Sequence, residues 1–234
     1  AIRPQYWFAM SFITAAKPQH PPYVAQGRVY AVPPLHGRVR FAGLVRRAFF
    51  ALRPDAIAVE LPATLAASIR AGVQRLPYLS VVGYQDFDDK LEPVQQILPI
   101  TPDDSLCEAV RLGEAHWVPV HFIDRDVLNY QGGPVRAADD YLIERIGLEA
   151  YWRAVDKTLP RAAAGSQDAE REREMAAHLH ALTARHERVL YVCGLTHLTP
   201  VLEHLRRGAE ALPGAVTQRE HTLYHLARDS PGHV

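Results

Sequence analysis

The sequence predicts an α/β fold in which a mostly parallel sheet carries helices on both faces. Short apolar runs rich in β-forming residues alternate along the chain with segments whose apolar residues recur at helical spacing. The chain has 234 residues, of which 48% are hydrophobic and 22% are charged, so it can bury one sizeable core. We therefore expect a single α/β domain over residues 1–234, with a helical insertion at about residues 126–170.

The first half of the chain contains three expected strands and two expected helices. The strands are residues 28–35, 55–61 and 79–83, and the helices are residues 41–52 and about 63–76. Pro33 and Pro34 must end the first strand, because proline cannot donate to a sheet ladder. Pro77 ends the second helix, because it removes a backbone donor and clashes with the preceding turn.

The second half begins with a helix that Thr101-Pro102-Asp103-Asp104 opens, with Thr101 as the N-cap and an acid at the third helical position. The remaining strands are residues 117–123 and 189–194, and the remaining helices are residues 138–155, 168–185 and a segment from about 199. We expect a break near Gly147 in the first of these helices. The segment from His221 to His225 is expected to be the polar face of a helix, because its two histidines are four residues apart.

Charge and cysteine content exclude several classes of protein. Lys+Arg and Asp+Glu number 26 each, so no basic surplus favours a nucleic acid or an anionic membrane as partner. Cys107 and Cys193 are too few for a disulfide scaffold or a Cys-rich zinc module. No G-x-S-x-G elbow, Walker A loop or G-x-G-x-x-G follows any expected strand, which excludes the α/β-hydrolase, P-loop and dinucleotide-binding classes.

Apolar runs in the chain are far shorter than the roughly 20 residues that span a bilayer, so we expect no membrane span. The apolar stretch from Tyr6 to Ala16 lacks the basic start of a signal peptide, and we expect a cytoplasmic location. The chain starts at Ala1 and stops at Val234 without a closing element. We therefore expect that it is part of a longer protein whose other domains are partners of this one.

Four chemistry-bearing side chains fall at the carboxyl ends of expected strands. These residues are His36, Glu60, Asp124 and His197. Ligands of open α/β sheets bind beyond the carboxyl ends of the strands. Imidazoles with a carboxylate are the usual ligands of a catalytic divalent metal, which lowers the pKa of a bound water. The placement therefore predicts a metal-assisted site at this edge of the sheet.

Each of these residues also has an ordinary structural interpretation. A histidine after a strand is commonly a loop residue, and Glu60 in an apolar run is expected to need an ion-pair partner such as an arginine. Asp124 and Arg125 are also typical of a turn with a local ion pair. Only the coincidence at several strand ends favours a functional site.

Several short motifs resemble the Tiki/TraB/PrgY superfamily, which is related to ChaN and the erythromycin esterases. The segment from Arg53 to Leu61 (RPDAIAVEL) resembles the family's "rPd-x-v-x-vEL" element, and Arg171 to Ala176 resembles its "R-[DEN]-x-x-[LM]-A" helix. Gly194 to His197 matches the second Gly-x-x-His motif, and Ile123-Asp124-Arg125 matches the family's "i-D-R". The first Gly-x-x-His motif differs, because Pro33 stands in place of its glycine before His36.

The resemblance implies roles for these residues and a reaction class. His36, Glu60 and His197 would be ligands of Mn²⁺, Co²⁺ or Zn²⁺, or acid–base groups of a site that needs no metal. Arg171 would stabilise an oxyanion or orient Glu60, and Asp124 would orient a histidine. Gly194 and Arg125 are the other motif residues. The implied activity is hydrolysis of a peptide or a small ester or amide. The alternatives are a non-catalytic domain that binds a peptide or ligand, and a ChaN-like domain that binds haem or iron.

Overall fold

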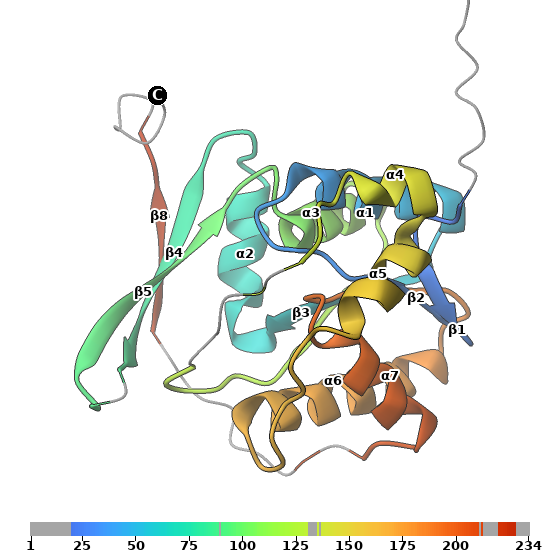
Figure 1. The fold of residues 1–234 in the computed structure, drawn as a ribbon. Coiled ribbons are helices and arrows are strands. Elements are labelled where there is room, and N and C mark those ends of the chain that lie inside the picture. Colours follow the sequence, from blue (N-terminus) through green and yellow to red (C-terminus); the bar gives the residue numbers. More distant parts are fainter. Residues whose placement is uncertain are drawn as a thin grey trace, which may run out of the picture.

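The molecule contains a five-stranded sheet that confirms the α/β class. The computed structural model describes residues 20–88, 90–130, 135, 137–210, 212 and 220–227. The strand order of this sheet, sheet A, is β1-β2-β7-β3-β6, and every pair except β1 with β2 is parallel (Figure 1). The strands are β1 (Val24–Gln26), β2 (Val29–Val32), β3 (Ala56–Pro62), β6 (Val120–Asp124) and β7 (Val189–Val192).

The two central strands explain why sheet A was predictable. Every residue of β7, and every residue of β3 before its last, is buried. A parallel strand covered on both faces is typically a near-continuous apolar run, and AIAVEL and VLYV have this form. Glu60 is the one charged residue in β3, so its burial requires a partner.

Helices cover both faces of sheet A, as the sequence predicts. On one face α1 (Val39–Leu52) packs against α3 (Ser105–His116), and on the other α6 (Gln167–Thr183) packs against α7 (Leu198–Arg206) (Figure 1). The first face also carries a short 3₁₀ turn, η1 (Ala63–Leu65), and α2 (Ala66–Val73). Of the helices in the described part of the chain, none has the length and apolarity needed to cross a bilayer.

The segment expected to be a helical insertion contains two short helices, α4 (Leu142–Ile146) and α5 (Leu148–Asp156). The predicted break between them is confirmed at Gly147, whose φ of 84° favours glycine. Residues 131–134 and 136 of this segment lie outside the described residues. The long helix α6 begins at Gln167, inside the expected range of the insertion.

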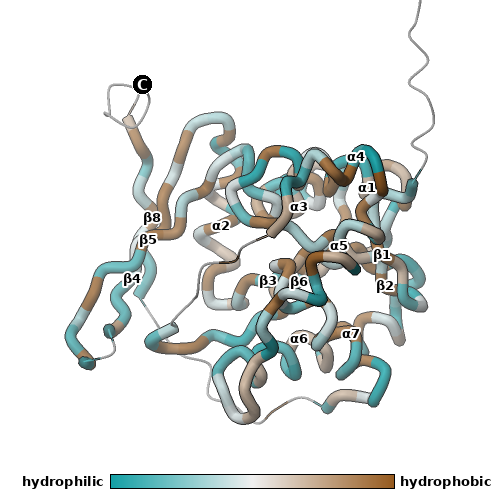
Figure 2. The backbone as a smooth tube through the Cα atoms, viewed as in Figure 1, coloured by the Kyte–Doolittle hydropathy of each residue, from teal (hydrophilic) through white to brown (hydrophobic). Residues whose placement is uncertain are grey.

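A second, antiparallel sheet differs most from expectation. Sheet B has the order β5-β4-β8 and lies beside the main body, with strands β4 (Ser80–Phe87), β5 (Pro93–Ile100) and β8 (His221–His225) (Figure 1). The prediction of a helix at residues 221–225 is wrong, because this segment pairs with β4 along its whole length. Strands β1 and β5 were not expected, and β4 is longer than the predicted strand at 79–83. Hydrophobic and hydrophilic residues are mixed along β4 and β5 (Figure 2). Neither strand therefore shows the regular alternation of apolar and polar residues that predicts a half-buried strand.

The N-cap of α3 also differs from the prediction, and the difference affects the site. Asp104 rather than Thr101 is the N-cap, and its carboxylate accepts a hydrogen bond of 2.8 Å from the Cys107 N–H. Thr101 instead accepts a backbone hydrogen bond from the Asp104 N–H in the turn that precedes the helix. The cap holds the Asp104 carboxylate next to His36.

Candidate functional site

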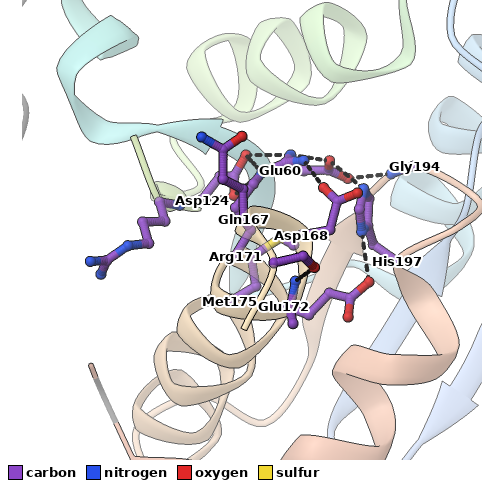
Figure 3. A network of polar contacts seen from close by, with 12 residues as sticks. Glu60, Asp124, Gln167, Asp168, Arg171, Glu172, Met175, Gly194 and His197 are labelled. Carbon is purple, nitrogen blue, oxygen red and sulfur yellow. Dashed lines mark hydrogen bonds and ion pairs between the residues drawn. The ribbon is translucent and has the colours of Figure 1, made fainter. Parts of the chain in front are cut away.

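The topology of sheet A brings the predicted residues to one edge. Strands β3, β6 and β7 are neighbours and run parallel, so Glu60, Asp124 and Gly194 meet at their carboxyl ends. Helix α6 crosses this edge and inserts Arg171 between the two carboxylates (Figure 3). His197 follows Gly194 at the start of α7.

Arg171 is saturated by carboxylates. Its Nη2 donates to Glu60 Oε1 and to Asp124 Oδ2 at 2.7 Å each, and its Nε donates to Asp124 Oδ1 at 3.1 Å. Its Nη1 donates to Asp168 Oδ1 at 2.9 Å, and the Tyr130 ring lies over the guanidinium. Each of its three nitrogens therefore donates to a carboxylate, which favours orientation of Glu60 over direct stabilisation of an oxyanion.

Glu60 is held as an ionised carboxylate. Its second oxygen, Oε2, accepts a hydrogen bond of 2.5 Å from the Gly194 N–H. Burial alone would raise the pKa of Glu60, but His197, Arg171 and His36 outweigh it and hold the pKa below its ordinary value. Asp124 differs: burial raises its pKa, and the nearby negative charge of Glu60 adds to the rise, although Arg171 opposes both.

His197 is oriented by a second carboxylate. Its Nδ1 donates to Glu172 Oε1 at 3.0 Å, and its Nε2 faces Glu60 Oε1 at 3.6 Å. Burial lowers the pKa of His197, but the charges of Glu60 and Glu172 outweigh it, so the pKa is raised. A carboxylate therefore faces each ring nitrogen of His197, and the raised pKa favours the protonated imidazolium.

His36 also directs Nδ1 at a carboxylate, but at a longer distance and with a more exposed side chain. Its Nδ1 lies 3.8 Å from Asp104 Oδ2, and its side chain is 51% exposed. The interaction with Asp104 raises the pKa of His36, and burial opposes it. A methyl group on Gly194 would lie 3.3 Å from both His36 Nε2 and Glu60 Oε2, so Gly194 lies directly between these two side chains.

The structure thus brings His36, Glu60, Arg171, Gly194 and His197 together, with Asp124 adjoining them. Asp124 contacts Arg171 rather than a histidine, so the contact implied for it by the resemblance is replaced by an ion pair. Arg125 directly follows β6 and faces Glu170 and Glu174 of α6.

Sequence reasoning missed Asp104 and Glu172, the carboxylates that orient the two histidines. Glu172 directly follows Arg171 in the helix motif, and Asp104 lies in the segment that opens a helix, so the sequence marks neither as the partner of a histidine. Because both pairings join residues distant in sequence, only the fold reveals them.

The donor set is not that of a preformed metal centre. Among the described residues, no three His, Cys, Asp or Glu side chains are arranged to hold a metal ion. Glu60 already accepts from Arg171 and Gly194, and a guanidinium occupies the cation position beside it. Binding of Mn²⁺, Co²⁺ or Zn²⁺ here stays a prediction.

A cavity of about 480 Å³ lies next to this network, between the 161–165 loop, α6 and α7. Its walls include Glu172 but not Glu60, His36 or His197. The cavity therefore borders Glu172, whose carboxylate orients His197, and not the half-exposed side of the site.

Comparison of the chain with protein-family models, with curated proteins and with solved structures finds no match in any of the three. The resemblance to the Tiki/TraB/PrgY superfamily therefore rests on the motif residues alone.

Proposed function

We propose that the protein is a hydrolase that cleaves an ester or amide bond by acid–base catalysis at His36, Glu60 and His197. The observation that carries the proposal is a shared geometry. Each histidine directs Nδ1 at a carboxylate, and each ring lies against Glu60 or the Gly194 backbone next to it. A carboxylate on Nδ1 selects the tautomer with a free Nε2 and supports its protonation, as a general base requires.

His36 is the proposed general base. It is half-exposed, so water and substrate can reach it, and Asp104 on its Nδ1 leaves Nε2 free to accept a proton. The water oxygen attacks the carbonyl carbon, and the proton of the water passes to His36 Nε2. The bond to the leaving oxygen or nitrogen then breaks as the leaving group takes up a proton.

His197 is the proposed general acid. Its raised pKa, caused by Glu60 and Glu172 against the effect of burial, favours the imidazolium that can protonate the leaving group. Glu60 holds this imidazolium, and Arg171 acts as a positioning residue that fixes Glu60. The motif resemblance supports the same reaction class, because the superfamily includes hydrolases.

The test is hydrolysis of a panel of chromogenic esters and peptide anilides by the wild type and by His36→Ala, His197→Ala and Glu60→Gln. General acid–base groups contribute about 10²–10⁴-fold, so each variant should lose at least about 100-fold in kcat/KM. His180→Ala is the matched control, because His180 is an exposed histidine on the same helix as Glu172. Unchanged turnover in folded His36→Ala or His197→Ala would refute the proposal.

A second function, a non-catalytic domain that binds a peptide or ligand, is favoured by one observation. Both Glu60 oxygens already have donors within the protein, as in a structural ion network. A lack of turnover on every substrate would favour this function. Elemental analysis with added Mn²⁺, Co²⁺ or Zn²⁺, and absorption spectra after haem addition, would test the metal and haem alternatives.

A further inference from the structure

A second group of histidines lies at the opposite, amino edge of sheet A. His121 is the second residue of the edge strand β6, and His186 lies in the turn between α6 and β7. His178, on α6, is near enough to His121 to lower the pKa of its imidazole. We infer that His121 and His186 form a binding site for a transition-metal cation such as Cu²⁺ or Zn²⁺, separate from the proposed hydrolytic site.

The separation of the two rings fits a shared ion. A metal bound about 2.0–2.1 Å from an imidazole nitrogen lies about 3.2 Å from that ring's centroid, so two rings that share an ion have centroids up to about 6.4 Å apart. The His121 and His186 centroids are 5.9 Å apart, and their planes are inclined at 57°. The rings are thus neither stacked against each other nor too far apart for chelation.

The second observation is an unsatisfied nitrogen. His121 Nε2 is shielded from solvent, and no hydrogen-bond partner for it is present in the described part of the structure. A buried polar atom without a partner is unfavourable, so native proteins rarely leave one unpaired. Coordination of a cation by this nitrogen would remove the deficit.

The surroundings keep His121 in the form that binds metals. Burial lowers the pKa of His121, and the neighbouring His186, Arg185, Arg70 and His178 lower it further. A lowered pKa favours the neutral imidazole, which is the form that binds a metal.

Two carboxylates lie near the other histidines of this group. Asp55 is close enough to His186 for the histidine to lower the pKa of its carboxyl, although burial opposes this and backbone donors contribute more. Glu174 Oε1 lies 3.4 Å from His178 Nε2.

Because no three potential ligands are arranged around one point in the described residues, the two imidazoles would supply two nitrogens and water the remaining ligands. Imidazole donors suit Cu²⁺, Ni²⁺ and Zn²⁺ and bind Mg²⁺ or Ca²⁺ poorly. A bound ion would connect the edge strand β6 to the turn that precedes β7, and would thereby tie two parts of the fold distant in sequence.

The inference is tested with untagged protein and Cu²⁺ or Zn²⁺, measured by competition with a chromophoric chelator. The starting protein is the His36→Ala/His197→Ala double variant, which removes the histidines of the hydrolytic site. It should still bind one ion per chain. Adding His186→Ala should weaken binding at least about tenfold, because loss even of a group that supports a ligand costs 10–100-fold. Adding His180→Ala, the matched exposed histidine, should change nothing.

Two further readouts identify the ligands. The electron paramagnetic resonance spectrum of the Cu²⁺ form should show coupling to two nitrogens. The His186→Ala form should show coupling to fewer nitrogens than its parent. Zn²⁺ should raise the Tm of the double variant but not of its His186→Ala form, because a ligand that binds only the folded state stabilises it. The inference is overturned if the double variant binds no ion, or if His186→Ala binds as tightly as its parent.

Discussion

The two halves of the candidate site differ in burial and in the quality of their contacts. Arg171, Glu60, Asp124, Glu172 and His197 have side chains only 6–7% exposed. The His36 side chain is 51% exposed, and its carboxylate partner is 3.8 Å away. The first half is therefore a fixed framework on which folding depends, and the second is the half that solvent and substrate reach. Substitutions in the first should lower stability, together with activity where they remove Glu60 or His197, and those in the second should lower activity at little cost in stability.

The largest expected effect is on stability, from Arg171→Leu. This change leaves Glu60 and Asp124 buried without their cation, and breaking a buried ion pair by removing one partner costs about 3–5 kcal/mol. The free energy of unfolding, measured in urea, should fall by about that amount. Arg153→Ala is the control, because Arg153 forms an exposed pair with Glu149 worth about 0.5 kcal/mol or less. Equal small losses in both variants would contradict the division into two halves.

A smaller loss is expected where the halves meet, at Gly194. A methyl group there would lie 3.3 Å from both Glu60 Oε2 and His36 Nε2, so one of them must move. Because His36 is the freer group, Gly194→Ala should reduce kcat/KM strongly and stability by only about 1 kcal/mol. Gly43 in α1 is a matched control with open space around it, and Gly43→Ala should be neutral or stabilising. A loss of stability at Gly194 as large as that of Arg171→Leu would show that His36 belongs to the fixed framework.

The same contrast explains which features the sequence could predict. The central strands of sheet A are continuous apolar runs, and the ends of parallel strands must meet, so Glu60, Asp124 and His197 could be grouped in advance. Strand β8 is stabilised by its pairing with β4, which is remote in sequence, and its histidines fit a helix equally well. The partner of a side chain is likewise a non-local property, so Glu172, Asp104 and the pairing of Asp124 with Arg171 appear only in the structure.

Glu172→Gln should change the titration of His197 more than the fold. Loss of the carboxylate removes a cause of the raised pKa, so the pKa of His197, followed by NMR, should fall. A histidine whose pKa is raised by folding stabilises the protein at pH values below its unfolded pKa, and this contribution is lost as the pH rises through the folded pKa. The stability advantage of the wild type over Glu172→Gln should therefore be largest in acid and diminish at alkaline pH. An advantage that grows with pH would contradict the assigned pairing.

The smallest effect on stability, with a large effect on activity, is expected from Asp104→Asn. Asparagine caps helices as well as aspartate does, so the hydrogen bond from the Cys107 N–H to this side chain can be kept. The contact with His36 is long and half-exposed, so its loss should cost less than about 1 kcal/mol. The amide, however, can present a donor to His36 Nδ1, which would select the tautomer with a proton on Nε2 and remove the proposed base. We therefore expect a fall in kcat and in the pKa of His36 at nearly unchanged Tm. Asp104→Ser, which also caps but does not carry a charge, separates the two roles: if it matches the wild type in kcat, Asp104 acts on the helix alone.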